Sequence, residues 1–204
     1  MVYECTYDEL AAALAPHLDA DDLSTIRRAY ELAAAVHATQ MRDEGTPYIL
    51  HPLRVARALA EELRVTRPAL ISAALLHDVI EDSPDYYARG AVTRTDIAAE
   101  FGAEVAEIVW LLSKFADVTL PAYLAAIEER AATGAPLVKL CDRLDNLRSI
   151  VRSPKVDKIR RYIRTTEIFF LPMAARTNAY LHKELTRLVA EARRHLAEVT
   201  RRAS

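Results

Sequence analysis

The segment from 73 to 83 reads AALLHDVIEDS, and it decides how the rest of the chain is interpreted. Its apolar residues favour a helix, yet one histidine and three carboxylates follow between positions 77 and 82. Residues three and four apart share a helix face, so Glu81 lies one turn beyond His77 and Asp78. Asp82 lies one turn beyond Asp78 in the same way. Core helices ordinarily avoid such a gathering of charge.

A divalent cation is one explanation, because grouped carboxylates repel and lose hydration unless a cation compensates them. His51 and Asp142 are further candidate ligands. A mixed set of nitrogen and oxygen donors suits manganese, iron, zinc or magnesium, and spacing does not choose among them. The alternative is a helix that ends in solvated acids around a core histidine, and this segment alone leaves both readings open.

The rest of the sequence predicts an all-α protein. Of its 204 residues, 51% are hydrophobic and only 4 are glycine, and no segment shows sustained alternation of period two. We expect roughly eight to ten helices in a single domain over residues 1–204. Capping signals, prolines and apolar periodicity place them near 6–16, 23–41, 52–63, 68–82, 94–101, 105–112, 121–133, 136–151, 154–170 and 172–200.

Composition excludes several classes of protein. A formal net charge of −2 predicts no general attraction to nucleic acid or to an anionic membrane. Cys5 and Cys141 are too few for a disulfide framework, so we expect reduced thiols. The N-terminus lacks a basic and apolar leader, and no apolar run approaches the ~20 residues that span a bilayer. We therefore expect a cytoplasmic protein that does not associate with membranes.

Four segments together resemble the HD-domain metal-dependent phosphohydrolases, and within them the alarmone hydrolase branch of RelA/SpoT-type proteins and small alarmone hydrolases. They are HATQMRDEGTPYILHPLRVA (37–56), AALLHDVIEDS (73–83), FGAEVAEIV (101–109) and VKLCDRLDNLRS (138–149). They occur in the family's order and cover most of residues 25–155. The resemblance implies an HD-domain helical bundle, on which we expect the C-terminal helices from 154 to 200 to pack.

The resemblance also implies a reaction and the residues that carry it. The implied metal ligands, which usually hold manganese in this branch, are His51, His77, Asp78 and Asp142. The implied pair that positions and activates water is Glu81 and Asp82. The reaction of this branch removes pyrophosphate from the 3′ position of ppGpp or pppGpp and returns GDP or GTP, so the implied partner is a guanine nucleotide alarmone.

On the substrate side, Arg42 matches an arginine that packs on the nucleobase, while Asn146 and Ser149 match positions near the ribose and base. A guanidinium suits this role because it is flat, stays charged and stacks on aromatic rings. The alternative for Arg42 is a solvated loop arginine. Tyr123 either lines the pocket in the family manner or is an ordinary buried tyrosine.

Two positions depart from the branch. Asp43 replaces a common lysine after the arginine, and Asp145 replaces the histidine of DRLHN. Both changes make the neighbourhood more acidic, whereas a polyphosphate pocket gains from positive charge. The run from 152 to 164 carries six basic residues, which could supply that charge, contact RNA or a partner, or form a solvated helix face.

Several functions therefore compete. The leading hypothesis is manganese-dependent hydrolysis of (p)ppGpp. A related HD phosphohydrolase would act on an adenine alarmone, on the 2′-phosphate of NADPH, or on pyrophosphate placed on tRNA by a toxin, which would make the protein an antitoxin. A non-catalytic module that binds a nucleotide or a partner is a third class. The C-terminal amphipathic helix, with Leu181, Leu185, Leu188, Val189 and Leu196, predicts a packing surface or a homo-oligomer contact.

Overall fold

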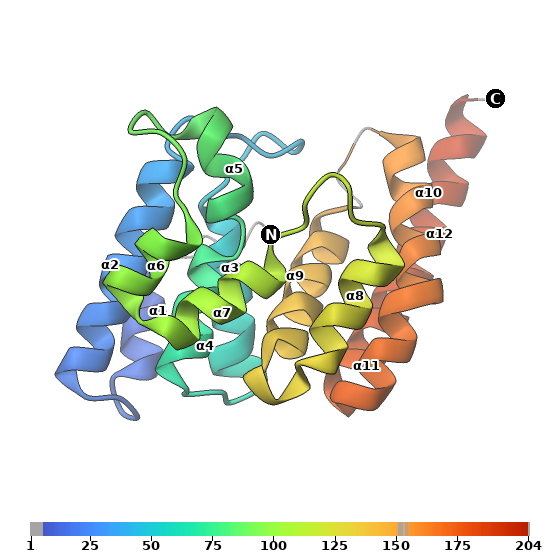
Figure 1. Cartoon of the computed structure of the whole chain (residues 1–204). Coiled ribbons are helices and arrows are strands. Elements are labelled where there is room, and N and C mark those ends of the chain that lie inside the picture. The colour runs from blue at the N-terminus through green and yellow to red at the C-terminus, as the bar shows by residue number, and fades with distance from the viewer. Residues whose placement is uncertain (1–5, 151–152, 154, 204) are drawn as a thin grey trace.

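The structure is a computed structural model that describes residues 6–150, 153 and 155–203, and helices dominate it (Figure 1). Within these residues the α-helices are α1 (Tyr7–Leu14), α2 (Ala20–Val36), α3 (Leu50–Arg57), α4 (Pro68–Leu76), α5 (Val79–Tyr86), α6 (Arg94–Phe101), α7 (Ala103–Leu112), α8 (Leu120–Glu129), α9 (Ala135–Ile150), α10 (Val156–Thr165), α11 (Leu171–Thr177) and α12 (Ala179–Ala203). Two π-helical segments, Ala58–Glu62 and Thr166–Phe170, continue α3 and α10, and a 3₁₀ turn spans Ala131–Thr133.

The all-α prediction is confirmed, and the larger number of helices has a local cause. Two predicted helices are interrupted, the one over 68–82 at His77 and Asp78 and the one over 172–200 at Asn178. Asn178 has an extended backbone, and its side chain accepts a hydrogen bond from Leu181 N at 3.1 Å, which caps α12. The predicted stop at 82 is wrong, because α5 tolerates Pro84 and continues to Tyr86.

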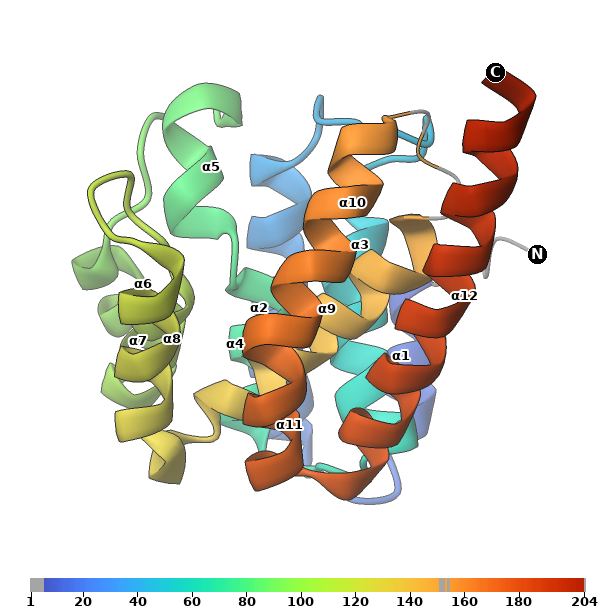
Figure 2. The same cartoon turned by 90° about the vertical axis from the view of Figure 1, so that its right-hand side faces the viewer.

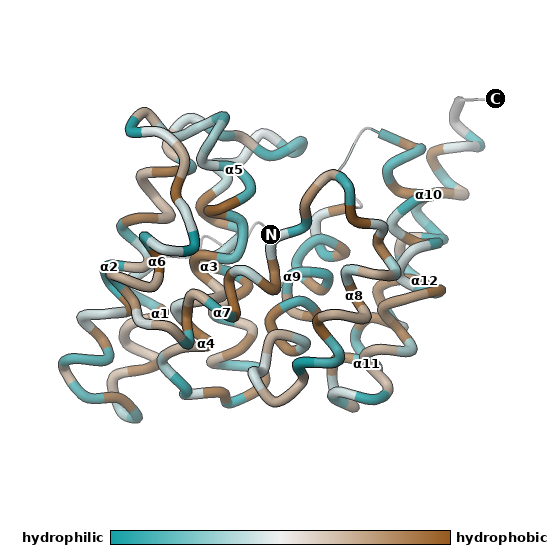
Figure 3. Tube along the Cα trace, in the orientation of Figure 1, coloured by the Kyte–Doolittle hydropathy of each residue, from teal (hydrophilic) through white to brown (hydrophobic). Residues whose placement is uncertain are grey.

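Helix α9 lies at the centre of the molecule (Figures 1 and 2). It contacts α3, α4 and α7 on one side and α8, α10, α11 and α12 on the other. Buried apolar side chains from Tyr7 in α1 to Ala192 in α12 form one continuous cluster, and Figure 3 shows hydrophobic and hydrophilic stretches recurring along the helices. A single domain remains our prediction, and one continuous apolar cluster is what it requires.

Gly134 sets how closely α9 approaches α4. Its φ of 85° lies in the left-handed region, and a Cβ added there would stand 2.7 Å from Leu70 Cδ2. A larger residue at this position would strain the backbone and would have to displace the Leu70 side chain. Glycine therefore lets the turn before α9 lie directly against α4.

The C-terminal helix packs within the chain. Leu181, Leu185, Leu188 and Val189 of α12 are buried in the apolar cluster. A homo-oligomer remains a prediction. Among the described residues, no helix is both long and apolar enough to cross a membrane. The thiol of Cys141 is free and buried, whereas Cys5 lies outside the described residues.

Candidate active site

The two candidate histidine ligands are oriented by hydrogen bonds on their Nδ1 atoms. His77 follows the last turn of α4, and its Nδ1 lies 2.8 Å from the carbonyl oxygen of Ala74. His51, in the first turn of α3, has its Nδ1 2.7 Å from Oδ2 of Asp145. A carbonyl and an ionised carboxylate only accept hydrogen bonds, so both rings donate from Nδ1. Both Nε2 atoms are thereby left to face the same space.

The carboxylates of Asp78 and Asp142 face these Nε2 atoms. Oδ2 of Asp78 lies 3.0 Å from Nε2 of His77 and 3.7 Å from Nε2 of His51. Oδ1 of Asp142 lies 3.3 Å from Nε2 of His51. Nε2 of His77 is buried and has no hydrogen-bond partner, and ligand atoms of His51, His77 and Asp78 lie within 4.8 Å of one another. This donor set fits a divalent cation.

Neighbouring polar groups hold both carboxylates in place. The hydroxyl of Tyr48 donates to Oδ2 of Asp78 at 2.7 Å. Nζ of Lys139 lies 2.8 Å from Oδ2 of Asp142, and Asn146 donates to its other oxygen. Burial opposes ionisation of Asp142, but Lys139, His51 and His77 together lower the pKa of Asp142. The acids therefore stay ionised with fixed orientations, as metal ligands require.

The predicted catalytic carboxylates lie in the first turn of α5. Oε1 of Glu81 accepts a hydrogen bond from the backbone N of Lys114 at 2.8 Å. Oδ2 of Asp82 accepts one from the side-chain amide of Gln40 at 2.9 Å, and Oε1 of Gln40 lies 2.7 Å from Nδ1 of His37. Burial, followed by the charge of Asp78, raises the pKa of Asp82, and burial likewise raises that of Glu81. Raised carboxyl pKa values suit groups that exchange protons near neutral pH.

A cavity of about 270 Å³ opens beside these groups. Three cations, Lys114, Lys139 and Arg143, line it together with Tyr123. The Arg143 guanidinium stacks over the rings of Phe170 and Tyr162. The hydroxyl of Tyr123 donates to the carbonyl of Leu112, and burial raises the pKa of Tyr123 to about 12. Tyr123 is thus both a buried tyrosine and part of the cavity wall.

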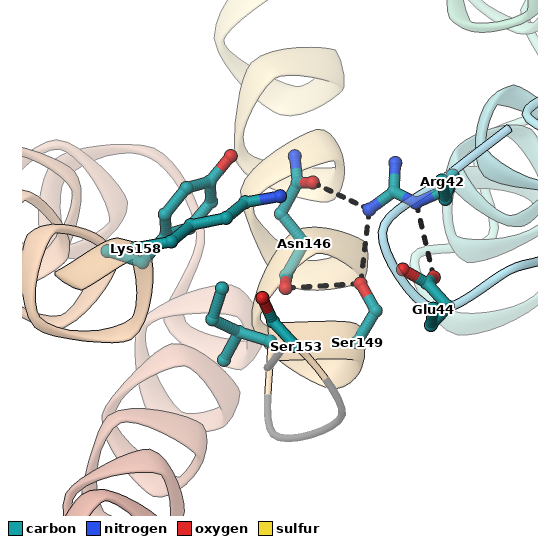
Figure 4. Close-up of a pocket in the computed structure, with 8 residues that line it drawn as sticks. Arg42, Glu44, Asn146, Ser149, Ser153 and Lys158 are labelled. Carbon is teal, nitrogen blue, oxygen red and sulfur yellow. Dashed lines mark hydrogen bonds and ion pairs between the residues drawn. The ribbon is translucent and has the colours of Figure 1, made fainter. Parts of the chain in front are cut away.

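The nucleotide-side candidates Arg42, Asn146 and Ser149 meet in a smaller adjoining pocket (Figure 4). Nη2 of Arg42 donates to Oδ1 of Asn146 at 2.9 Å and to Oγ of Ser149 at 3.1 Å. Its Nε donates to Glu44 at 3.2 Å. Arg42 is therefore not a solvated loop residue. The pocket holds only about 10 Å³, and Arg42 forms part of its wall.

The two departures from the family pattern take up different positions. Asp43 lines neither cavity, and its carboxylate lies 2.8 Å from Nζ of Lys155 and 2.6 Å from Nζ of Lys158 at the start of α10. Hydrogen bonds from Lys155 and Lys158 lower the pKa of Asp43 to about 2. Asp145 also lines neither cavity, since its carboxylate faces His51 and Arg54. Neither acid therefore adds its carboxylate directly to a pocket wall, and a substrate-side role of Asp43 stays a prediction.

Sequence reasoning missed several residues that hold the site together, namely Gln40, Tyr48, Arg54, Lys114, Lys139 and Arg143. Lys139 lies three residues before Asp142, so helix spacing offered a signal for that pair. Gln40 and Tyr48 lie in a loop and reach Asp82 and Asp78 across more than one element. Nothing in local spacing predicts such contacts.

Comparisons with known proteins agree with this geometry. A model of the HD domain family matches residues 29–179. A guanosine-3′,5′-bis(diphosphate) 3′-pyrophosphohydrolase of Vibrio cholerae is 35% identical over 91% of this chain, which spans only 26% of that relative. The human protein named guanosine-3′,5′-bis(diphosphate) 3′-pyrophosphohydrolase MESH1 is 37% identical over 64% of this chain and 72% of its own length.

A solved structure shares the fold with a TM-score of 0.69 at 26% identity, covering 82% of this chain and 95% of the other. It is described as a metazoan ortholog of SpoT that hydrolyses ppGpp and plays a role in starvation responses. The chain belongs to the HD domain family. Within that family it is related to MESH1 and to the bifunctional (p)ppGpp synthase/hydrolase SpoT of Escherichia coli, of which it spans about a quarter (26%).

Proposed function

We propose that this chain removes pyrophosphate from the 3′ position of ppGpp or pppGpp, with manganese as its metal and in the cytoplasm. The observation that carries the proposal is the pair of Nε2 atoms on His51 and His77 facing Asp78. Glu81 and Asp82 lie in the first turn of α5, directly after Asp78. Relatives named for this reaction are 35 to 37% identical to the chain over the aligned residues.

The candidate ligands would hold a divalent cation, which lowers the pKa of water and draws electrons from a phosphoryl oxygen when bound. Glu81 or Asp82 then accepts the proton of the water that attacks the phosphorus next to the ribose. The bond between that phosphorus and the 3′ oxygen breaks, the 3′ oxygen takes up a proton, and pyrophosphate leaves. A raised pKa makes either carboxylate a stronger base than an ordinary acid of its type.

The cations of the larger cavity, Lys114, Lys139 and Arg143, would offset the phosphate charges. Arg42, with Asn146 and Ser149, would receive the base and ribose. Because the smaller pocket is too small for a base and Arg42 in its wall is bonded to Asn146 and Ser149, we expect the guanidinium to leave these two partners and stack on the incoming base.

A related HD phosphohydrolase is the second candidate, and Asp43 is the observation that favours it. Asp43 forms ion pairs with Lys155 and Lys158. These two lysines are therefore less available to bind a polyphosphate on that side of the site. An adenine alarmone, NADPH or pyrophosphorylated tRNA would then be the substrate, the last implying an antitoxin. A non-catalytic binding module is less favoured, because it has no use for Glu81 and Asp82 beside the metal ligands.

The test is product analysis on a nucleotide panel. Protein freed of metal and then supplied with manganese is offered ppGpp, pppGpp, the adenine analogue and NADPH, and the products are separated by ion exchange. We expect pyrophosphate and GDP from ppGpp at the highest rate. A Glu81→Gln preparation controls for contaminating phosphatases. Release of orthophosphate in place of pyrophosphate, or faster turnover of another substrate, would contradict the proposal.

A further inference from the structure

Asp145 lies on α9 behind the candidate metal ligands, where the alarmone hydrolase pattern commonly has histidine. The residue is only 3% exposed and lines neither cavity. Contact with substrate or solvent therefore does not explain an acid at this position. Burial of an ionised carboxylate is costly unless hydrogen bonds and opposite charge compensate it.

Three hydrogen-bond donors converge on its two oxygens. Nδ1 of His51 lies 2.7 Å from Oδ2, Nε of Arg54 lies 2.6 Å from Oδ1, and Nη2 of Arg54 lies 3.2 Å from Oδ2. A carboxylate satisfies all three, because both of its ends only accept. An amide of the same shape would turn its NH₂ group toward either Arg54 or His51. One donor would then lose its acceptor, or the His51 ring would have to move its proton to Nε2.

We propose that Asp145 is a positioning residue for the metal, which holds His51 with its proton on Nδ1 and its Nε2 aimed at the cation. Arg54 orients the Asp145 carboxylate and compensates its charge. His77 obtains the same orientation from a backbone carbonyl, that of Ala74, so the two histidines are fixed by different means. The inference rests on the metal centre of the proposed function, and it does not depend on which nucleotide is the substrate.

Manganese titration of the metal-free protein by calorimetry compares wild type, Asp145→Asn and Glu62→Gln. Glu62 is a matched control, since like Asp145 it accepts two hydrogen bonds from one arginine, in its case Arg148 at 2.7 and 2.8 Å. It is not among the candidate ligands or their described partners. We expect Asp145→Asn to weaken manganese binding by about 10- to 100-fold, the usual loss for a partner of a ligating histidine, and Glu62→Gln to change it by less than about twofold.

A second measurement can contradict the proposal with the wild-type protein alone. ¹⁵N NMR of the histidine rings in metal-free wild type is expected to show the His51 proton on Nδ1, and Asp145→Asn is expected to move it toward Nε2. A proton on Nε2 in wild type would overturn the proposal, as would equal manganese affinity of Asp145→Asn and wild type. An equal loss in both variants would overturn it too, because the effect would then be general. Tight manganese binding without turnover of ppGpp would instead refute only the substrate assignment.

Discussion

Asp145 and Asp43 both replace a basic side chain of the family pattern, yet they belong to two different regions. Asp145 lies in the floor of the site, which also contains His51, His77, Asp78 and Asp142, and it is almost fully buried. Asp43 lies at the rim, formed by residues 41–47 and the start of α10, and one of its partners, the Lys155 side chain, is 64% exposed. Breaking a buried ion pair costs about 3–5 kcal/mol, whereas an exposed pair contributes about 0–1 kcal/mol. Exposure to solvent, more than the sign of the charge, decides what each replacement does.

The largest effect should come from removing a ligand in the floor. We expect His77→Ala or Asp78→Ala to lose both bound manganese and turnover, because the remaining acids repel one another without the full set of donors. Metal content by mass spectrometry, measured alongside the rate, decides this. Stoichiometric metal and wild-type turnover in either variant would show that the floor is not the metal centre.

Glu81 lies between the floor and the larger cavity. Replacing it shows whether turnover can be lost while manganese binding is kept. Glu81→Gln should retain manganese and the fold but slow turnover by roughly a hundredfold or more, the usual loss for a positioned acid or base. Glu129→Gln, an exposed acid on α8, serves as the control for a neutralised charge. Near-normal turnover of Glu81→Gln would leave Asp82 as the remaining base.

Gln40 precedes the rim in sequence and donates a hydrogen bond to Asp82. Replacing Gln40 should therefore change how kcat/KM depends on pH. Because burial raises the pKa of Asp82, loss of activity on acidification should begin at a higher pH than for an ordinary aspartate. The Gln40 amide opposes this shift, so Gln40→Leu should raise that pKa further and move the acidic limb of kcat/KM to higher pH. The plateau at high pH should change little. An acidic limb that stays in place while a basic limb moves to higher pH would show that Asp82 works in its protonated form.

The smallest effect should come from the rim. Asp43→Asn frees Lys155 and Lys158, and Asp43→Lys adds a further cation, so both should raise kcat/KM for ppGpp. About 1 kcal/mol survives screening in a wet loop, which corresponds to roughly fivefold, mostly through KM and less at high salt. Asp157→Asn, another exposed acid at the start of α10, is the control. A poorer enzyme would indicate that Asp43 serves a different substrate, and an unchanged one that the rim does not meet the phosphates.

Periodicity predicted the helices well, because each one buries an apolar stripe whose spacing is visible in the sequence. It did not predict the break at His77 and Asp78, which interrupts a run with good helix formers on both sides. The break reflects the tertiary arrangement, in which His77 completes α4 while Asp78 precedes α5. The π-helical segments that continue α3 and α10 have no local signal either.

In the candidate site, too, some residues were predicted from the sequence and others were not. The acids and histidines of HDVIED stood out because such residues rarely cluster in a core. Their partners were not predicted, since the hydrogen bonds of Gln40 with Asp82 and of Asp145 with His51 join residues 42 and 94 positions apart. The sequence identified Asp145 as a departure from the family pattern. It could not show that the Asp145 carboxylate faces His51, because that depends on how α9 packs against α3.

Because the chain is interrupted between α4 and α5, this candidate metal site is hard to transfer to another protein by single substitutions. In a straight helix, side chains 77 and 78 would diverge by about 100°, and the Ala74 carbonyl would be taken by the backbone N of residue 78. Here that carbonyl belongs to the last turn of α4, which leaves it free to orient the His77 ring. A protein engineer could exchange rim residues one at a time, but would have to graft residues 74–78 together with their backbone shape. Evolution faces the same constraint, so this short segment is expected to be inherited as a block.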